Sequence, residues 1–314
     1  MTGDASALFR SRVLFVSGKG GVGKTTTAAA VGRVAAAMGR RTLVMEVDNQ
    51  HPSLPAIFGK PATHQPTEVE PNLWIANTEW KPALEDWVES IVSMRRLVRL
   101  IMKNRVVSLF LQVTPGARDL VMLWRVSEVA KVFDLVVVDM PASGNAVAML
   151  SVPLTAERLF PSGPIRACAD ALLALVARPD TALVLVALPE EMVVNETLET
   201  LGRLHTGMPT LRVPIILLNR ASMPTLSERE RSLLRALERE FTEGVAVEVL
   251  EAGAWEEGLE AATGEALSRL QEARRPVIAL PALPRNDGAR RVVAQVASAL
   301  ARGAGLRIAL RGAG

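Results

Sequence analysis

The chain has 314 residues and a net charge of +3, and 49% of its residues are hydrophobic. These values are typical of a globular protein with one large α/β domain or two small ones. No apolar run approaches the length of about 18 residues that predicts a transmembrane helix. The low charge and the lack of basic blocks interleaved with aromatic residues indicate that nucleic acid is not a partner.

The cysteine content and the start of the chain indicate the compartment. Cys168 is the single cysteine, which excludes an internal disulfide and a paired-cysteine metal site. Residues 1–10 lack the apolar core of a signal peptide. We therefore expect a cytoplasmic protein with Cys168 as a small core residue.

A glycine-rich loop follows the first apolar run. Residues 13–16 predict a buried strand, and residues 24–38 predict a helix that ends at Gly39. The loop between them matches the phosphate-binding pattern G-x-x-x-x-G-K-S/T and consists of Gly18, Lys19, Gly20, Gly21, Val22, Gly23, Lys24, Thr25 and Thr26. Strand, glycine loop and helix in this order predict a nucleotide-binding site.

The residue types in this loop indicate how it would hold phosphate. Glycines let the backbone N–H groups converge on phosphate oxygens, and the helix that follows directs its positive end at the same anion. Lys24 adds a positive charge near the terminal phosphates, and the Thr25 hydroxyl is expected to bind Mg²⁺.

Two further strands are expected to bring carboxylates to the same edge of the sheet. Residues 41–47 predict a strand that delivers Asp48, with Glu46 as a competing carboxylate. Residues 134–139 form an apolar run that ends in Asp139, a pattern typical of a buried parallel strand. Because the ligand crevice lies at the carboxyl ends of such strands, we expect Asp139 to hold Mg²⁺, directly or through water. Either Asp48 or Glu46 would act on the phosphate end.

The middle of the chain interrupts the alternation of strands and helices. Residues 60–80 are rich in Pro, Thr and Glu, and we expect them to be irregular. A helical pattern opens at Pro82, and its apolar face contains Trp87, Ile91, Met94, Val98 and Ile101. We interpret residues 60–113 as a helical insertion within a single domain of residues 1–314. Its apolar face would pack on the domain core or form a groove for a client helix.

The second half returns to the α/β order. The expected helices are residues 114–132, one from Gly144 that Pro153 closes, and residues 164–177, 227–241, 255–273 and 287–302. The expected strands are residues 182–188, 213–218 and 276–280. Residues 245–250 alternate between apolar and polar like a strand, and we expect them to form an edge strand or a loop. Residues 303–314 favour a frayed terminus over a membrane-binding helix. These elements predict an α/β fold with a mostly parallel sheet flanked by helices.

Asn219 stands at the end of one of these strands. An amide side chain has both a donor and an acceptor, so it can pair with the edge of adenine. We therefore expect Asn219 to recognise the base.

Lys19 extends the phosphate-loop pattern. A second lysine directly after the first glycine marks the deviant phosphate loop of dimeric ATPases, which include MinD, ParA, the nitrogenase iron protein and the ArsA family. Further motifs resemble the ArsA family in particular, and they are Asp48–Leu54, Asp139–Asn145, Pro189–Thr197, Asn219-Arg220 and Pro281–Pro284. The chain thus resembles the short bacterial single-domain form of this family, which includes the guided-entry ATPase for tail-anchored membrane proteins.

The match has departures. His51 matches a histidine of the family, but Asn49, Gln50 and Pro52 differ from its pattern, and Asn145 replaces a histidine.

The resemblance implies a P-loop NTPase that hydrolyses ATP with Mg²⁺. Lys24 and Lys19 would stabilise the transferring phosphate, and Asp48 would orient the attacking water. The other positions that match nucleotide-contacting residues are Gly144, which would sense the γ-phosphate, Glu190 near the dimer interface, Asn219 at adenine and Pro284 in the loop over adenine.

The resemblance also implies a dimer, either a homodimer or a heterodimer with a paralogue, in which Lys19 reaches the nucleotide of the partner. Opening and closing of this dimer would act as a switch for a client or a membrane-associated partner. The alternatives are a chaperone or targeting factor that binds apolar helices through the insertion, and a positioning ATPase like MinD or ParA. The arsenite-binding cysteines of the family have no counterpart here, so no metalloid site is expected.

Overall fold

The structure is a computed structural model, and it describes residues 6–47, 49–92, 116–224, 226–240, 245–283, 288–306 and residue 308. The strands of this part of the chain are β1 (Val13–Ser17), β2 (Thr42–Val47), β3 (Thr67–Glu70), β4 (Leu73–Thr78), β5 (Leu135–Asp139), β6 (Thr181–Ala187), β7 (Ile216–Ala221) and β8 (Val277–Pro281). They form one sheet with the order β3-β4-β2-β5-β1-β6-β7-β8.

The sheet is parallel except for its edge pair, β3 and β4. The predicted fold class, an α/β P-loop NTPase fold with a mostly parallel sheet flanked by helices, is confirmed.

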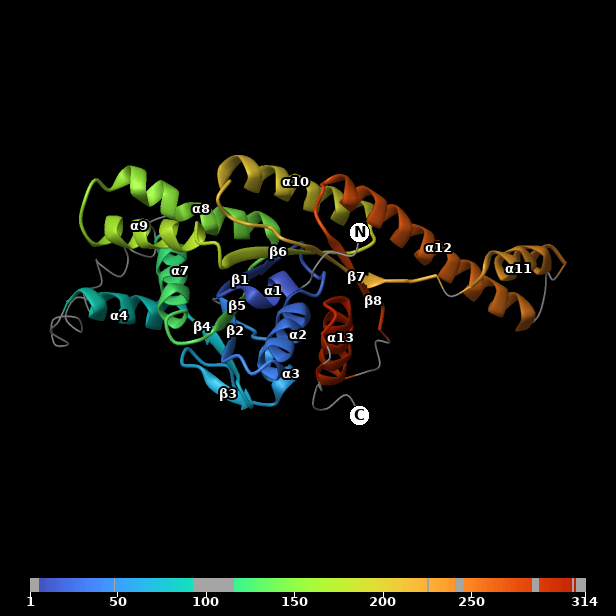
Figure 1. The fold of residues 1–314 in the computed structure, drawn as a ribbon, viewed down its shortest axis with the longest axis horizontal. Coiled ribbons are helices and arrows are strands. Elements are labelled where there is room, and N and C mark those ends of the chain that lie inside the picture. Colours follow the sequence, from blue (N-terminus) through green and yellow to red (C-terminus); the bar gives the residue numbers. More distant parts are fainter. Residues whose placement is uncertain are drawn as a thin grey trace.

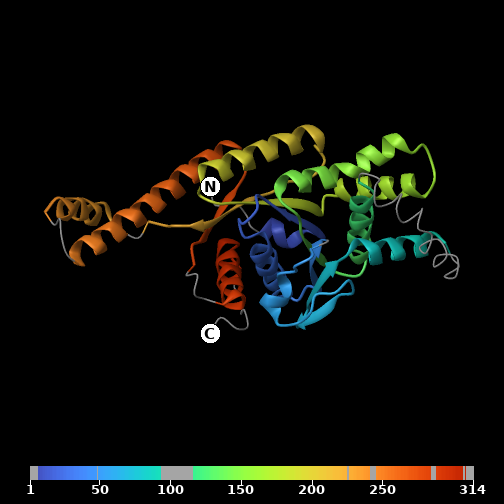
Figure 2. The same ribbon diagram turned by 180° about the vertical axis from the view of Figure 1, so that it is seen from behind.

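The described helices flank the sheet on both faces (Figure 1). They are α1 (Ser6–Arg10), α2 (Lys24–Ala37), α3 (Leu54–Phe58), α4 (Trp80–Ile91), α7 (Ala117–Val129), α8 (Ser143–Leu159), α9 (Pro164–Val176), α10 (Glu191–Gly207), α11 (Glu228–Glu240), α12 (Val245–Glu272) and α13 (Ala289–Gly303). Helices α2, α3 and α13 lie below the sheet in Figure 1, and α8, α9 and α10 lie above it. Seen from behind, α12 extends beyond the sheet with α11 beside its outer end (Figure 2).

The central strand β1 shows how the sequence produces these two layers. Successive side chains of a strand point to opposite faces. Leu14 and Val16 belong to the apolar cluster that contains α2 and α13. Val13 and Phe15 belong to the cluster that contains α7, α8 and α9. All four side chains are fully buried, because a central parallel strand is covered on both faces.

The expectation that residues 60–80 are irregular is wrong, because β3 and β4 lie in this region. Leu73 and Ile75 are fully buried in β4, and Asn72 makes the turn between the two strands with a φ of 63°. The apolar run of β4, Leu73–Ala76, is short and has polar residues on both sides, so it is a weak signal for a strand in the sequence. Within residues 60–113, α4 is helical, whereas residues 93–113, with Met94, Val98 and Ile101, lie outside the described residues. The helical insertion and the single-domain organisation stay predictions.

Three other expectations are wrong in detail. Residues 245–250 belong to α12 and not to a strand. Pro153 does not end its helix, since α8 continues to Leu159 with Leu150, Pro153 and Ala156 all buried. Burial of this face keeps the helix intact although proline removes one backbone hydrogen bond. Strand β7 begins at Ile216, three residues later than expected.

One further finding concerns membrane insertion. Among the helices that the structure describes, none is both long and apolar enough to cross a bilayer.

Gly32 marks the closest approach of α2 to the sheet. A Cβ atom at this position would lie 2.3 Å from Cγ2 of Val44 in β2 and 3.2 Å from Cδ1 of Leu73 in β4. Alanine normally favours a helix over glycine by about 1 kcal/mol, but overpacking a core costs about 1–3 kcal/mol. Overlap at 2.3 Å is severe enough for the packing cost to dominate.

We therefore predict that Gly32→Ala lowers the free energy of unfolding by about 1–3 kcal/mol, measured by urea denaturation. The matched control is Gly202→Ala in the middle of α10, where a new Cβ would have no neighbour within 4 Å. This control should raise the free energy of unfolding by about 0.5–1 kcal/mol. If Gly32→Ala raises the free energy of unfolding as Gly202→Ala does, then α2 does not pack as closely against β2 and β4 as the structure indicates.

Candidate functional site

The expected site residues gather at the carboxyl edge of the sheet. β1 lies between β5 and β6, and the phosphate loop leaves β1 at Ser17. The loop after β5 contacts this loop directly, because the N–H of Ser143 donates a hydrogen bond to the carbonyl of Gly18 at 3.0 Å. Loops at the carboxyl ends of neighbouring parallel strands form the usual ligand crevice of such a fold.

Glycine is required at two points of the phosphate loop. Gly18 has a φ of 152°, and a Cβ there would lie 2.2 Å from the carbonyl oxygen of Val186 in β6. Gly23 has a φ of 92° and precedes α2, and its Cβ would lie 2.5 Å from Nδ2 of Asn219. Glycine therefore lets the loop pass close to β6 at Gly18 and to Asn219 of β7 at Gly23. The loop then leads directly into the N-terminus of α2, which is the positive end of the helix dipole.

Asp139 lies at the end of β5 beside the first turn of α2. Its Oδ2 accepts a hydrogen bond of 2.5 Å from the hydroxyl of Thr25. Its Oδ1 is buried, and no group among the described residues donates to it. Burial raises the pKa of Asp139 to about 6; the hydrogen bond from Thr25 opposes the rise, the charge of Glu46 adds to it, and Lys24 opposes it. Asp139 is thus a buried carboxylate with one hydrogen-bonded oxygen, Oδ2, and one oxygen without a hydrogen bond among the described residues, Oδ1.

Asp139 and Thr25 fit the Mg²⁺ site that the sequence predicts. Mg²⁺ in nucleotide sites is commonly held by one or two protein oxygens, together with phosphate oxygens and water. The described residues contain no group of three His, Cys, Asp or Glu that could bind a metal by itself. The unpaired Oδ1 of Asp139 and the Thr25 hydroxyl are oxygen ligands of the required type.

Lys24 folds back over its own loop. Its Nζ donates to the carbonyl of Lys19 at 3.2 Å, so the side chain lies along the loop. Burial lowers the pKa of Lys24, while the charges of Asp139 and Glu196 partly restore it. A cavity of about 320 Å³ beside Lys24 and Thr25 reaches Asp139 and Glu46.

Glu46 stabilises the loop that follows β2. One of its carboxylate oxygens accepts hydrogen bonds from the Asn49 side chain at 2.9 Å and from the Ser53 N–H at 2.8 Å, and the other accepts from the Leu54 N–H at 3.2 Å. The Glu46 side chain is 1% exposed. Asp48 itself lies outside the described residues. His51 lies in the same loop and is exposed, and its N–H donates to the Asn49 side chain.

Asn77 is a site residue that the sequence analysis missed. Its side chain donates to the Asn49 carbonyl at 2.8 Å and accepts from the Asn49 N–H at 3.3 Å. The available signal was the apolar run Leu73–Ala76 before it, which could have been read as a strand that ends in a polar side chain. Asn77 and Glu46 together attach the loop after β2 to the sheet.

A second polar cluster joins the phosphate loop to α8 and α10. Glu196 of α10 accepts a hydrogen bond from the Ser143 hydroxyl, and its other oxygen lies 3.8 Å from Nζ of Lys19. Gly144 follows Ser143 in the first turn of α8, and space lies open at its Cβ position. Lys19 is thus paired within its own chain in this structure.

The other side of the phosphate loop opens into a cavity of about 590 Å³. Gly23, Thr26, Glu190 and Asn219 line it together with Trp255 of α12. The side-chain nitrogen of Asn219 donates to the Val22 carbonyl at 2.8 Å. This bond fixes the amide and leaves its oxygen and second N–H for a ligand.

Trp255 was missed by the sequence analysis, which read it as the start of a helix. Its side chain is 72% exposed although it lines this cavity. Pro284 lies outside the described residues, but the preceding Leu283 lines the cavity.

A parallel sheet, a glycine loop that opens into a helix, and a strand-end aspartate beside the loop threonine define the class of P-loop NTPases. Residues 11–163 match the sequence model of a protein family described as anion-transporting ATPase, the ArsA family. The matching region begins just before β1 and includes the phosphate loop, the loop after β2 and Asp139. The resemblance to the ArsA family is thereby confirmed over this part of the chain.

Curated relatives agree with this match. An uncharacterized protein of Streptomyces coelicolor is 35% identical over 53% of this chain and 44% of its own length. ATPase BagA of Mycobacterium tuberculosis is 28% identical over 64% of this chain and 63% of its own length. ATPase ASNA1 homolog 1 of Paramecium tetraurelia is 25% identical over 46% of this chain and 44% of its own length. The chain therefore spans less than two thirds of the length of these relatives.

The raised pKa of Asp139 predicts how stability changes with pH. A carboxyl whose folded-state pKa, about 6, exceeds its reference value of 3.8 contributes stability at low pH that is lost as the pH rises through 6. A shift of about two units corresponds to about 3 kcal/mol. In Asp139→Asn the amide oxygen can still accept the Thr25 hydrogen bond, but it carries no charge.

We therefore predict that, between about pH 4 and pH 7, the nucleotide-free wild-type protein loses about 2–3 kcal/mol of unfolding free energy relative to Asp139→Asn. Urea denaturation of both proteins across this range measures the difference. If the difference in unfolding free energy between the two proteins stays constant with pH, the pKa of Asp139 is not raised, and the description of its carboxyl as buried with one unpaired oxygen is contradicted.

Proposed function

We propose that the chain is a Mg²⁺-dependent ATPase of the ArsA type whose nucleotide cycle switches a dimer. The observation that carries this proposal is the buried Asp139 carboxylate, hydrogen-bonded to Thr25 and unpaired at Oδ1. An unpaired buried carboxylate costs free energy unless a cation or donor compensates it. MgATP in the phosphate loop would supply that cation, and the names of ATPase BagA and ATPase ASNA1 homolog 1 agree with this activity.

The residues divide into two roles at the phosphate end. The amides of the loop and Lys24 would bind the phosphates and stabilise the charge that develops during transfer. Thr25 and Asp139 would hold Mg²⁺, which would neutralise phosphate charge when bound. Lys24 would have to leave the Lys19 carbonyl to reach the phosphates.

The contacts of Glu46 favour Asp48 as the residue that orients water. Both Glu46 oxygens accept hydrogen bonds from the loop that follows β2. A carboxylate occupied in this way is poorly placed to accept a proton from water as well. We assign Glu46 a positioning role and Asp48 the role of orienting water.

At the base end, the free oxygen of Asn219 would accept from the amino group of adenine. Trp255 offers an exposed indole on the wall of the same cavity, and stacking on a base is a common use of such a ring. Glu190, Thr26 and the segment from Leu283 to Pro284 would complete the base and ribose end.

The switch would act through the contacts of Ser143 and Glu196. Ser143 joins the loop after β5 to the Gly18 carbonyl and to Glu196, which also pairs with Lys19. A γ-phosphate at the N–H of Gly144 would therefore act on the same cluster that holds Lys19. We propose that Lys19 leaves Glu196 and reaches the nucleotide of a partner subunit, in a homodimer or in a heterodimer with a paralogue.

We further propose that this dimer acts in the cytoplasm on a helical client or a membrane-associated partner. This part of the proposal rests on the resemblance to the ArsA family, in which the dimer serves such partners.

Removing the loop lysine tests nucleotide binding. Lys24→Ala should lower ATP affinity by at least about tenfold, because it removes a charged contact to phosphate worth about 1.5–3 kcal/mol. Calorimetric titration with MgATP measures this. The control is Lys60→Ala, an exposed lysine that lies outside both cavities beside the loop. Equal affinities of the two variants would contradict the phosphate-loop proposal.

Removing the proposed water-orienting carboxylate tests catalysis separately. Asp48→Asn should keep ATP affinity within about twofold but lower the rate of phosphate release by about 10²–10⁴, the usual range for a general base. A phosphate-release assay measures this rate. Normal turnover in Asp48→Asn would transfer the role to Glu46 or to another group.

The pairing of Lys19 with Glu196 predicts an effect on dimerisation. Because this partly exposed ion pair is worth about 0.2–1 kcal/mol, Glu196→Gln should lower the ATP concentration for half-maximal dimerisation by up to about fivefold. Glutamine can still accept the Ser143 hydrogen bond. Light scattering during ATP titration measures the midpoint, with Glu199→Gln on the exposed side of α10 as control. The proposal that Lys19 leaves Glu196 on dimerisation would be wrong if the half-maximal ATP concentration rises in Glu196→Gln, or if it changes equally in Glu196→Gln and Glu199→Gln.

A further inference from the structure

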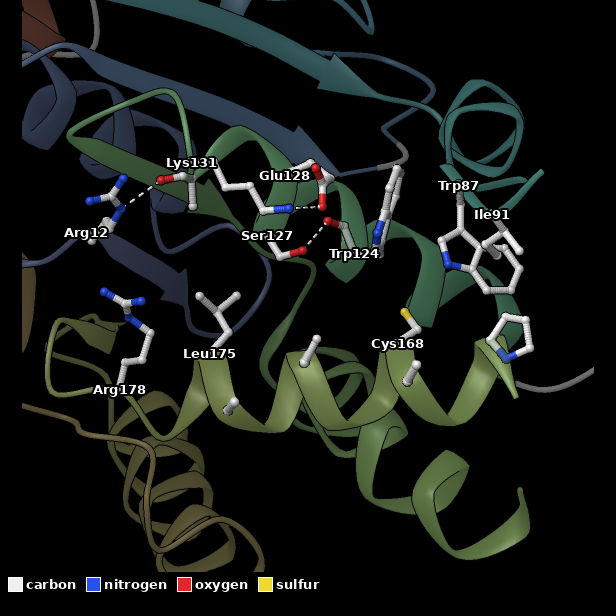
Figure 3. A pocket seen from close by; sticks show the side chains of 15 residues that line it. Arg12, Trp87, Ile91, Trp124, Ser127, Glu128, Lys131, Cys168, Leu175 and Arg178 are labelled. Carbon is white, nitrogen blue, oxygen red and sulfur yellow. Dashed lines mark hydrogen bonds and ion pairs between the residues drawn. The ribbon is translucent and has the colours of Figure 1, made fainter. Parts of the chain in front are cut away.

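A second recess lies apart from the nucleotide site. It has a volume of about 840 Å³, lies between α4, α7 and α9, and shares no lining residue with the cavities beside the phosphate loop. We call it the α9 groove, and Figure 3 shows it from close by. Its volume falls in the usual range of small-molecule sites.

The two walls of the α9 groove are lined by apolar side chains, small ones on one wall and large ones on the other. One face of α9 lines it with Ala167, Ala171 and Ala174, which recur at helical spacing and are exposed. Opposite this wall, α4 contributes Trp87, and α7 contributes Trp124 (Figure 3). Small side chains across from large ones leave a long apolar space that a narrow, flexible chain can fill.

One end of the groove is cationic. Arg12 and Arg178 lie there, the Lys131 side chain extends from this end toward Glu128, and Trp87 and Ile91 stand at the other end (Figure 3). Two of the three cations are matched. Arg178 makes a bidentate pair with Asp180, with hydrogen bonds of 2.8 and 2.7 Å, and Lys131 lies 2.6 Å from Glu128.

Arg12 carries the excess charge: Asp180 attracts Arg12 as well as Arg178, but the three cations outnumber the two carboxylates, Glu128 and Asp180, by one. Its Nε donates to the Ala130 carbonyl at 2.7 Å, which fixes the side chain. Its two terminal nitrogens have no hydrogen-bond or ion-pair partner among the described residues. A fixed guanidinium with free terminal N–H groups suits a carboxylate, which it can bind with two hydrogen bonds. One unmatched positive charge corresponds to a monoanion.

The length of the groove indicates the size of the apolar part. Lining residues on α9 and just after it extend from Pro164 to Arg178. At about 1.5 Å per residue, this stretch is about 21 Å long. An extended chain advances about 1.2 Å per bond, so a chain of about 16 to 18 carbons matches the groove.

We propose that the α9 groove binds a long-chain fatty acid, with its carboxylate on Arg12 and its alkyl chain along α9 toward Trp87 and Ile91. The charge count favours a single carboxylate over a doubly charged phosphate. The apolar walls favour an alkyl chain over a polar ligand. This binding site is separate from the proposed ATPase site, so either proposal can fail without the other.

The test is titration of the full chain, without nucleotide, with hexadecanoate below its micelle concentration, followed by calorimetry. Saturable binding of one hexadecanoate per chain is expected. Arg12→Gln should weaken hexadecanoate binding by at least about tenfold, because a charge-assisted contact is lost, and should leave the binding of uncharged hexadecan-1-ol unchanged.

A matched pair of variants tests the apolar part. Ala171→Phe fills the groove from an exposed position and should weaken both ligands, whereas Ala177→Phe, exposed at the end of α9 but outside the lining, should weaken neither. Thermal unfolding of each variant checks that it is folded. The proposal is overturned by an absence of saturable binding, by binding that ignores both Arg12→Gln and Ala171→Phe, or by stronger binding of hexadecan-1-ol or of an uncharged apolar peptide than of hexadecanoate.

Discussion

The half-satisfied carboxylate of Asp139 is the constraint around which the nucleotide edge is arranged. The parallel register of β1 and β5 pairs Val16 with Asp139, directly before the phosphate loop begins. The Thr25 hydroxyl occupies one oxygen of Asp139, and burial raises the pKa of the carboxyl to about 6. The folded protein therefore carries a local cost in free energy that a bound cation would relieve. Sites with such unrelieved cost are frequent where proteins bind ligands.

The neighbouring loops are held by separate networks, and this separation matters for a switch. Glu46 and Asn77 fix the loop after β2 through its own backbone. Ser143 and Glu196 connect the loop after β5 to Lys19 and to α10. The cavity beside Lys24 and Thr25 is also lined by Glu46 and Asn49 of the first network, and Lys19 of the phosphate loop belongs to the second. In the proposed switch, loss of a ligand from the phosphate loop would release both loops. The α9 groove lies outside both networks, which is why its occupancy and the nucleotide cycle can be tested independently.

The sequence predicted what depends on local patterns. The phosphate loop, β5 with its terminal Asp139, and the α/β order follow from glycine spacing and continuous apolar runs. β4 was missed because its apolar run, Leu73–Ala76, is short and is flanked by polar residues. Leu73 and Ile75 are fully buried because the run pairs with β2 and packs in the core, which no local pattern shows. The contact of Glu196 with Lys19 joins residues far apart in the chain, so no local pattern could reveal it. The continuation of α8 past Pro153 likewise depends on packing that proline chemistry alone does not indicate.

The most direct test of this account is the titration of the Asp139 carboxyl itself, followed by its ¹³C chemical shift in aspartate-labelled protein. Without nucleotide, the account predicts a midpoint near the pKa of about 6 that burial produces. With Mg²⁺ and ATP present, the midpoint should fall by at least about one unit, because a bound cation favours the ionised carboxylate. A midpoint near the reference value of 3.8 in the nucleotide-free protein, unchanged by Mg²⁺ and ATP, would contradict the account.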